Sequence, residues 1–251
     1  MRMSKRMRAR RREKRQDMLR AIIATFAIIF IAIGIYAGSF YRADTDAING
    51  YAAASYVEEQ TLLDGSIAFV PAGATAGVIF YPGGKVELNA YIPLMQAIAA
   101  KGIAAIAVKM PLNLAVLKIS AADGIREQFP NIGSWYMAGH SLGGAMAANY
   151  VYDNPDEFDG LILLGAYSTA NLSNKELKVL SVYGSADKIL NADKYEKNKG
   201  NLPETVTEIV IDGANHSGYG MYGAQKGDGE ATMSNAEQIN MTADLIAEFI
   251  N

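Results

Sequence analysis

The hydrophobic pattern of the chain changes sharply near residue 42. Before that point, residues 21–41 form one run of 21 residues without a charged side chain. After it, short apolar runs alternate with segments whose apolar residues recur at helical spacing, which is typical of a parallel α/β sheet. The expected strands are residues 66–70, 76–81, 103–108, 134–138, 160–164, 178–183 and 206–211. The expected helices are residues 90–101, 120–129, 142–153 and 234–250. Several of these strands are continuously apolar, which predicts a sheet covered by helices on both faces.

The apolar run 21–41 is long enough to cross a membrane, because a helix of that length spans roughly 31 Å. Residues 1–20 contain ten of the 23 Lys and Arg residues but only two of the 26 Asp and Glu residues. Such a basic flank favours the cytoplasmic side. We therefore expect a basic cytoplasmic segment at 1–20, a transmembrane anchor at 21–41 and the remaining chain outside the cytoplasm. A cleaved signal peptide is the alternative, since Ala37-Gly38-Ser39 is small enough for a peptidase.

Composition and charge narrow the classes of protein. Half of the residues are hydrophobic and 20% are charged, as in an ordinary folded domain. The absence of cysteine excludes a disulfide scaffold, a cysteine-ligated metal site and a thiol nucleophile. After residue 20 the chain has 13 basic and 24 acidic residues, which argues against nucleic acid as a partner of the folded part. Residues 42–55 are predicted to be a short linker, and residues 56–251 a single domain.

A motif for nucleophilic catalysis lies between an expected strand and an expected helix. Gly139-His140-Ser141-Leu142-Gly143 fits the pattern G-x-S-x-G. In such a sharp turn the serine is held in a strained conformation, and the two glycines remove side chains that would collide with neighbouring backbone. Ser141 would then project from the carboxyl edge of the sheet, where open α/β sheets bind ligands. The motif predicts a serine nucleophile at Ser141.

The chain has only two histidines that can serve as the base for this serine. His140 is adjacent to Ser141 in the turn, so its side chain is expected to pack beneath the turn. His216 follows the expected strand 206–211 through a short loop, at the carboxyl edge where Ser141 also lies. We therefore predict that His216 is the general base.

An acidic residue between the serine and the histidine in sequence would orient that base. Asp187 follows the expected strand 178–183 and reaches the same edge of the sheet. Asp193 and Asp212 are the alternatives, but Asp193 falls within a charged helix and Asp212 is very close to His216 in sequence. We predict Asp187, whose carboxylate would hold the imidazole in one tautomer and stabilise the imidazolium.

An oxyanion hole needs two backbone N–H donors near the serine. One is the amide of Leu142, the residue after the nucleophile. The second is expected in the loop after the strand 76–81, which reads Tyr-Pro-Gly-Gly-Lys. Gly84 is the predicted donor, with Gly83 and Lys85 as alternatives.

The order and context of these motifs resemble the α/β-hydrolase fold, and most of all a bacterial subgroup of small, membrane-anchored hydrolases. The resemblance is carried by YPGGKVE (81–87), VKMPLNLAV (108–116), GHSLGGAMAA (139–148), YGSADKI (183–189) and GANHSGYGMYG (213–223). It implies an eight-stranded, mostly parallel sheet. It also implies a triad of Ser141, Asp187 and His216, with Gly84 and Leu142 as oxyanion donors.

One departure from larger members of that family affects the substrate pocket. Only residues 165–177 separate the two strands between which a helical cap would be inserted, so the cap is minimal. The Gly- and Tyr-rich loop 217–230 is therefore expected to wall the site instead.

These patterns together predict an exported serine hydrolase that cleaves a small carboxylic ester or related acyl compound through an acyl-enzyme. They imply no metal and no organic cofactor. Its expected partners are a small acyl substrate and, through residues 21–41, the membrane. The alternatives are an acyltransferase that uses the same triad and a catalytically silent binding module that has kept the scaffold.

Overall fold

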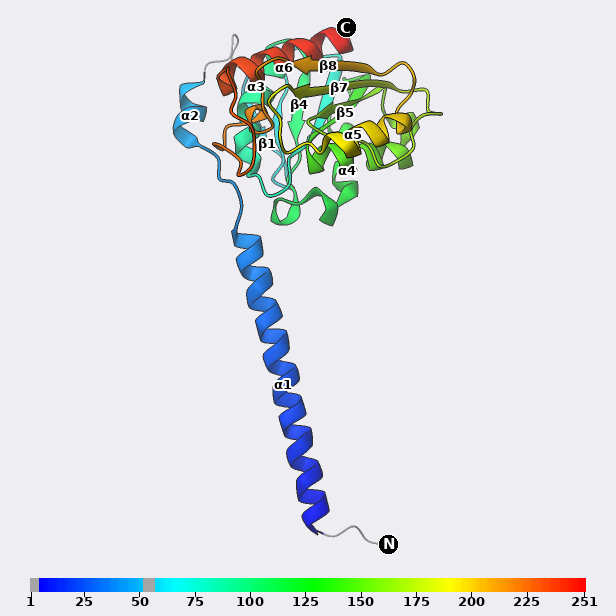
Figure 1. Ribbon diagram of the computed structural model, residues 1–251. Coiled ribbons are helices and arrows are strands. Elements are labelled where there is room, and N and C mark those ends of the chain that lie inside the picture. The colour runs from blue at the N-terminus through cyan, green and yellow to red at the C-terminus, as the bar shows by residue number, and fades with distance from the viewer. Residues whose placement is uncertain (1–4, 52–56) are drawn as a thin grey trace. The chain divides into compact units, whose positions relative to one another are not determined.

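The computed structural model describes residues 5–51 and 57–251. These described residues divide into two compact units, one that ends at Phe40 and one that begins at Tyr41. The first unit is built on one helix, α1 (Lys5–Gly38) (Figure 1). Its part Arg12–Tyr36 is long and apolar enough to cross a membrane, although a signal sequence passes the same test. Helix α1 ends before the predicted span does, so residues 39–41 are not part of the helix. Residues 1–4 of the predicted basic segment lie outside the described residues.

The second unit, which we call the domain, is organised by an eight-stranded sheet in the order β1-β2-β4-β3-β5-β6-β7-β8. The strands are β1 (Glu59–Thr61), β2 (Ile67–Phe69), β3 (Ala76–Tyr81), β4 (Ala104–Ala107), β5 (Ser134–His140), β6 (Gly160–Leu164), β7 (Lys178–Gly184) and β8 (Thr207–Ile211). β1 and β2 are antiparallel to their neighbours, and the other pairings are parallel. The predicted eight-stranded, mostly parallel sheet is confirmed. β1 has no counterpart among the strands expected from the hydrophobic pattern.

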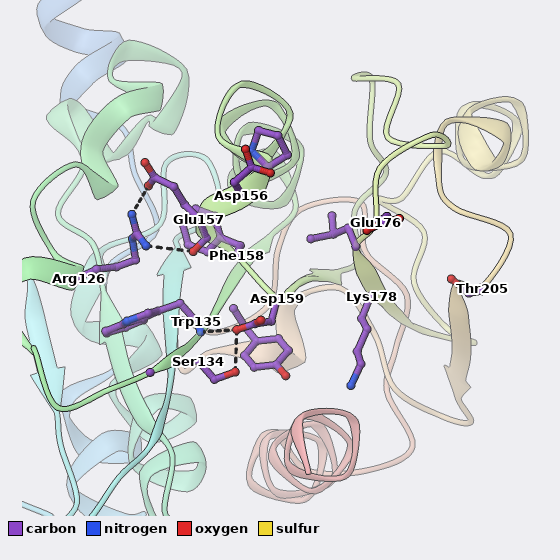
Figure 2. Close-up of a pocket in the computed structure, with 14 residues that line it drawn as sticks. Arg126, Ser134, Trp135, Asp156, Glu157, Phe158, Asp159, Glu176, Lys178 and Thr205 are labelled. Carbon is purple, nitrogen blue, oxygen red and sulfur yellow. Dashed lines mark hydrogen bonds and ion pairs between the residues drawn. The ribbon is translucent and has the colours of Figure 1, made fainter.

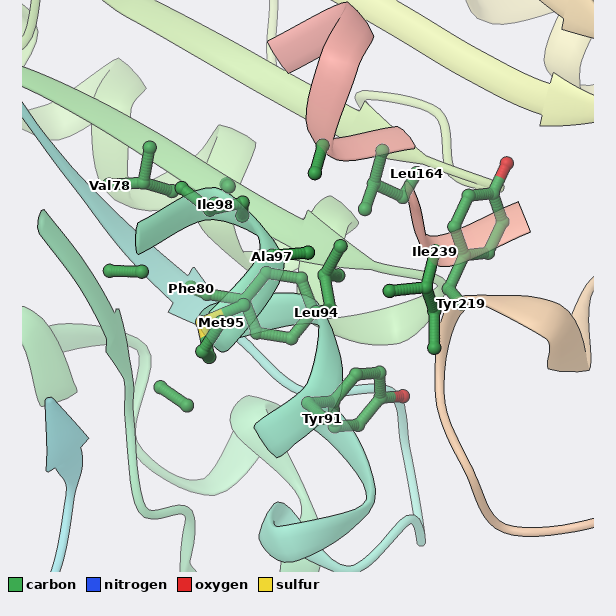
Figure 3. Close-up of a cluster of buried hydrophobic side chains, with 14 of the residues drawn as sticks. Val78, Phe80, Tyr91, Leu94, Met95, Ala97, Ile98, Leu164, Tyr219 and Ile239 are labelled. Carbon is green, nitrogen blue, oxygen red and sulfur yellow. The ribbon is translucent and has the colours of Figure 1, made fainter. Parts of the chain in front are cut away.

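Helices cover both faces of this sheet, as predicted. The longer helices of the domain are α3 (Ile92–Ala99), α4 (Leu142–Asp153), α5 (Ala192–Asn198) and α6 (Asn235–Ile250). Figure 1 shows α3 and α6 on one face and α4 on the other. Successive side chains of β3 point to opposite faces of the sheet. Val78 and Phe80 belong to the core under α3 and α6, whereas Ile79 and Tyr81 belong to the core under α4. Figure 3 shows the first of these cores, in which Phe80 packs against α3.

The helix boundaries follow local sequence signals. Helix α4 spans the expected residues 142–153. Helix α6 begins after Ser234, whose hydroxyl accepts from the Glu237 N–H while the Glu237 carboxylate accepts from the Ser234 N–H. This reciprocal capping box satisfies two backbone donors at the start of the helix. The start of α6 is therefore set by Ser234 and Glu237.

The expected helix at 120–129 is wrong. The structure has two short 3₁₀ turns there, Ile119–Ala122 and Arg126–Gln128, separated by Gly124 at φ +75°. A residue in the left-handed region interrupts an α-helix, and glycine adopts that region without strain. The glycine thus outweighs the helical spacing of the apolar residues around it.

Tyr41, the last residue of the predicted anchor, and the described part of the predicted linker belong to the second compact unit. The Tyr41 N–H donates to the Lys85 carbonyl at 2.7 Å, and the Ala43 N–H donates to the Glu87 carboxylate at 2.9 Å. A short helix, α2 (Thr45–Gly50), follows. Residues 41–51 therefore form part of the domain, and residues 52–55 lie outside the described residues.

Candidate active site

Ser141 lies at a sharp turn between β5 and α4, as the motif predicts. Its backbone has φ 53° and ψ −123°, a region that non-glycine residues rarely adopt and that costs about 1–3 kcal/mol. The flanking glycines are required by close backbone approach. A Cβ on Gly139 would lie 2.5 Å from the Gly143 carbonyl carbon, and a Cβ on Gly143 would lie 2.2 Å from the Tyr81 carbonyl oxygen. The turn therefore tolerates no side chain at either position.

His216 and Asp187 form a buried pair. His216 Nδ1 lies 2.8 Å from Asp187 Oδ2, and each side chain is only 1% exposed. The other oxygen, Asp187 Oδ1, accepts the backbone N–H groups of Ile189 and Leu190, each at 2.8 Å. A carboxylate oxygen accepts hydrogen bonds but does not donate them. The proton between His216 Nδ1 and Asp187 Oδ2 is therefore carried by Nδ1. His216 Nε2 then carries a lone pair.

The two alternative acids lie elsewhere. Asp212 Oδ1 accepts the Ser185 hydroxyl at 3.0 Å in an exposed position, and Asp193 lies exposed in the first turn of α5. Neither side chain contacts His216 in the part of the chain that the structure describes. Asp187 is the acid that the fold brings to this histidine.

Ser141 and His216 line one cavity of about 330 Å³. Its other walls come from the start of α4, the loop after β6 and the segment that leads into α5: Leu142, Ala145, Gly165, Ala166, Tyr167, Ile189, Leu190, Asn191 and Lys194. The buried His216 Nε2 has no hydrogen-bond partner among the described residues, so it is not bonded to the Ser141 hydroxyl. Catalytic hydrogen bonds are often long in unliganded enzymes. The expectation that loop 217–230 walls the site is not met, because no residue of that loop lines this cavity.

The loop after β3 lies against the start of α4. A Cβ on Gly84 would lie 2.9 Å from the Leu142 side chain. Of the three candidate donors in this loop, the Gly83 N–H donates to the Tyr91 hydroxyl at 3.0 Å, and the Lys85 N–H donates to the Asn113 carbonyl at 2.7 Å. The Gly84 N–H has no such bond within the described residues. Gly84 is therefore the amide of this loop that stays available to a ligand.

His140 packs beneath the turn, as predicted. Its Nδ1 lies 2.8 Å from the Tyr91 hydroxyl, which already accepts the Gly83 N–H. The ring centroids of His140 and His216 are 4.5 Å apart. Burial, and then the proximity of His216, hold the pKa of His140 well below its usual value. His140 therefore stays neutral and links the loop after β3 to the ring of His216.

Two residues of this site were not predicted from the sequence. Gly165 directly follows β6 and has φ +52°, and a Cβ there would lie 3.0 Å from His216 Nδ1 and 3.2 Å from Asp187 Oδ2. Asp228 accepts the backbone N–H groups of His216 at 3.3 Å and Ser217 at 2.8 Å. No local pattern marks either residue, because both act on segments that are distant in sequence.

A larger cavity, of about 770 Å³, lies at the opposite edge of the sheet, by the amino ends of β5, β6 and β7 (Figure 2). Several of its polar side chains are already paired. Arg126 forms an ion pair with Glu157, and Asp159 accepts the Ser134 hydroxyl and the Trp135 N–H. Among the described residues, no three His, Asp or Glu side chains are grouped to hold a metal ion. The candidate catalytic side chains lie instead at the carboxyl edge of the sheet.

A sequence model described as "Alpha/beta hydrolase family" matches residues 77–240, which include the turn at Ser141, Asp187 and His216. The chain belongs to the alpha/beta hydrolase family. No curated protein sequence gives a significant match. The predicted fold is thereby confirmed, including the minimal cap, because residues 165–177 join β6 to β7 without a helix.

Solved structures of other alpha/beta hydrolases share this fold at low sequence identity. A monoacylglycerol lipase from Paleococcus ferrophilus has a TM-score of 0.57 at 13% identity and covers 76% of this chain and 99% of its own. An esterase domain from a Rhodothermus marinus protein has a TM-score of 0.56 at 13% identity, over 77% and 96%. A dienelactone hydrolase from Anabaena variabilis has a TM-score of 0.54 at 15% identity, over 77% and 95%. Together with the family, these likenesses support a hydrolase.

Proposed function

We propose that this alpha/beta hydrolase is a membrane-anchored serine hydrolase that cleaves a small carboxylic ester or related acyl compound. The observation that carries the proposal is the buried Asp187–His216 pair, which leaves His216 Nε2 without a partner beside the cavity that Ser141 lines. A lone pair in that position is what a hydroxyl nucleophile needs as its proton acceptor.

In the proposed reaction the Ser141 hydroxyl attacks the acyl carbon while His216 Nε2 takes its proton. The negative charge that develops on the carbonyl oxygen is bound by the backbone N–H groups of Gly84 and Leu142. His216 then gives the proton to the departing alcohol, and the C–O bond to that alcohol breaks. Water, deprotonated by the same imidazole, hydrolyses the acyl-enzyme and regenerates Ser141. Asp187 keeps the imidazole in the required tautomer and stabilises the imidazolium.

The cavity supports a small acyl group. Its volume of about 330 Å³ is at the lower end of the usual range for ligand sites. Leu142, Ala145, Ala166 and Ile189 provide apolar surface for a short chain. The related structures of an esterase domain, a dienelactone hydrolase and a monoacylglycerol lipase are named for ester-type substrates. These names support an ester as the proposed substrate.

The proposed location is the outer side of the cytoplasmic membrane, with α1 as a single span and its basic amino end inside. The ten basic residues before the apolar run favour this orientation. Protease added to spheroplasts should then digest the domain, and full protection would refute the orientation. Cleavage near Ser39 would leave the domain complete, because the second compact unit begins at Tyr41. A mature chain that begins near Ser39 or Phe40 would replace the anchor with a signal peptide.

A fluorophosphonate probe tests the enzyme class, because it phosphonylates an activated serine. We expect one adduct, on Ser141, that is lost in Ser141→Ala and kept in the control Ser173→Ala, whose hydroxyl is exposed and bonded to Asn171. p-Nitrophenyl esters of increasing acyl length should show a preference for short chains. No adduct would favour a silent binding module, and an adduct with acyl transfer to alcohols instead of hydrolysis would favour the transferase.

A further inference from the structure

Exposed apolar side chains of the domain are concentrated in one short segment. Outside α1, the exposed large apolar side chains of the described residues are Leu63, Leu112, Val116, Leu117, Tyr152, Val210 and Met241. Three of these seven fall within six residues: Leu112 is 53% exposed, Val116 50% and Leu117 54%. We call residues 111–118 the apolar loop. A local concentration of this kind marks an interaction surface.

The backbone at Leu112, one of these three residues, is strained. Leu112 has φ 51° and Asn113 has φ 55°, a region that is unfavourable for a branched side chain such as leucine. Ala115 is buried and fixes the middle of the loop, while the Asn113 carbonyl accepts the Lys85 N–H at 2.7 Å. The loop is thus held in place by its backbone and by Ala115, while Leu112, Val116 and Leu117 are exposed.

The position of the apolar loop relates it to two other features of the domain. It follows β4 and therefore lies at the carboxyl edge of the sheet, as does the candidate active site. Through Lys85 it is also bonded to Tyr41, because the Tyr41 N–H donates to the Lys85 carbonyl at 2.7 Å. Tyr41 is the first residue of the domain and follows the apolar helix segment, which ends at Tyr36, by five residues in the sequence. The loop is accordingly linked to the point where the domain joins its anchor.

We propose that the apolar loop docks on the surface of the bilayer that α1 would span, an inference that rests on the proposed membrane anchor. Leu112, Val116 and Leu117 would enter the interfacial layer. The exposed Lys109, which precedes the loop, and Lys118, which ends it, would face anionic headgroups. A lipid surface is favoured over an acidic soluble partner because the loop is bonded through Lys85 to Tyr41, which follows the end of the apolar segment at Tyr36 by only five residues. The two lysines complement the anionic headgroups of such a surface. The docked loop would hold the carboxyl edge of the sheet at the lipid–water interface.

The absence of cysteine allows a direct test with single labels on the full chain. Val116→Cys and Val210→Cys form a matched pair, since the two valines are 50% and 47% exposed and Val210 lies on the edge strand β8. Each variant is labelled with the dye NBD and reconstituted in vesicles of phosphatidylcholine and phosphatidylglycerol. Nitroxide lipids then report contact with the bilayer. Carbonate extraction of the same vesicles checks that α1 is inserted.

We expect the label at residue 116 to be blue-shifted and quenched by nitroxide lipids at least about threefold more than the label at residue 210. Adding Leu112→Ser and Leu117→Ser to the Val116→Cys variant should remove that difference, and vesicles without phosphatidylglycerol should reduce it. Equal quenching at both positions would overturn the proposal. So would a blue shift at residue 116 that depends on protein concentration and not on lipid, which would indicate a second copy as the partner. The measurement uses no substrate, so its outcome is separate from that of the proposed hydrolysis.

Discussion

The substitution Asp187→Asn tests the candidate site most directly, because it keeps the shape of the side chain and changes its hydrogen-bonding character. Asp187 Oδ1 accepts two backbone N–H groups, and Oδ2 lies 2.8 Å from His216 Nδ1. In the variant the amide oxygen would keep the two backbone donors, which leaves the amide NH₂ facing His216. That group donates, so the imidazole would carry its proton on Nε2 and could not accept one from Ser141.

The size of the effect follows from this change of tautomer. The corresponding change in the serine-protease triad lowers kcat about 10⁴-fold, or about 5.5 kcal/mol of transition-state stabilisation. The folded state should lose much less. The hydrogen bond to Nδ1 is preserved with its direction reversed, and only its charge assistance is lost, which is worth about 1 kcal/mol. We therefore expect a large loss of kcat with little change in Tm.

The assay compares kcat on a short p-nitrophenyl ester and Tm for the wild-type chain and three variants. Asp193→Asn and Asp212→Asn are the controls, because neither side chain contacts His216 in the described structure. Both should stay within a few-fold of wild type. The role assigned to Asp187 would be refuted if Asp187→Asn kept more than about a tenth of wild-type kcat, or if Asp212→Asn lost as much activity as Asp187→Asn.

Two further predictions concern the surroundings of the histidines. Gly165→Ala should cost about 1 kcal/mol or more of stability and at least about tenfold in kcat, because φ is +52° and the new Cβ would press on His216 at 3.0 Å; unchanged kinetics with normal stability would contradict this. The pKa of His140 is depressed in the folded chain, so below about pH 6.5 the unfolded chain binds a proton that the folded chain does not. The free energy of unfolding therefore decreases as the pH falls, by up to about 1.4 kcal/mol per pH unit. His140→Asn, which keeps an acceptor for the Tyr91 hydroxyl, should show a smaller loss between pH 7.5 and 5.5 in urea unfolding, and an equal loss would contradict the assignment.

The elements that carry the candidate site were predictable because each depends on a local signal. The turn at Ser141 is marked by its glycines, and Asp187 and His216 each directly follow a strand of the same parallel sheet, so their meeting at one edge follows from topology. The strand β1 was not predictable, since its three residues Glu-Gln-Thr are all exposed and its conformation depends on pairing with β2. Asp228 was equally hidden, because its role arises only when its loop folds back onto the backbone at His216.

The position of loop 217–230 in the domain could not be predicted from its composition. Its Gly- and Tyr-rich composition favours an exposed wall around a pocket, yet Tyr219 is fully buried and its hydroxyl donates to the Val182 carbonyl at 3.1 Å. Tyr219 and Tyr222 belong to the core under α3 and α6, and Figure 3 shows Tyr219 there. Composition alone does not distinguish a tyrosine that faces a ligand from one whose hydroxyl has a backbone partner inside the domain. The cavity walls come instead from short segments next to β6 and α5.

The two histidines of the chain have different protonation states in the proposed mechanism. The Tyr91 hydroxyl accepts the Gly83 N–H, so its own proton is directed at His140 Nδ1, and the proton of His140 must lie on Nε2. With its pKa held well below the usual value, His140 remains uncharged beside a ring whose centroid is 4.5 Å away. In the proposed mechanism His216 becomes an imidazolium, and a second cation at that separation would oppose it in a buried site. A neutral His140 therefore leaves Asp187 as the charged partner of that imidazolium, and the same hydrogen bonds fix the loop that carries Gly84.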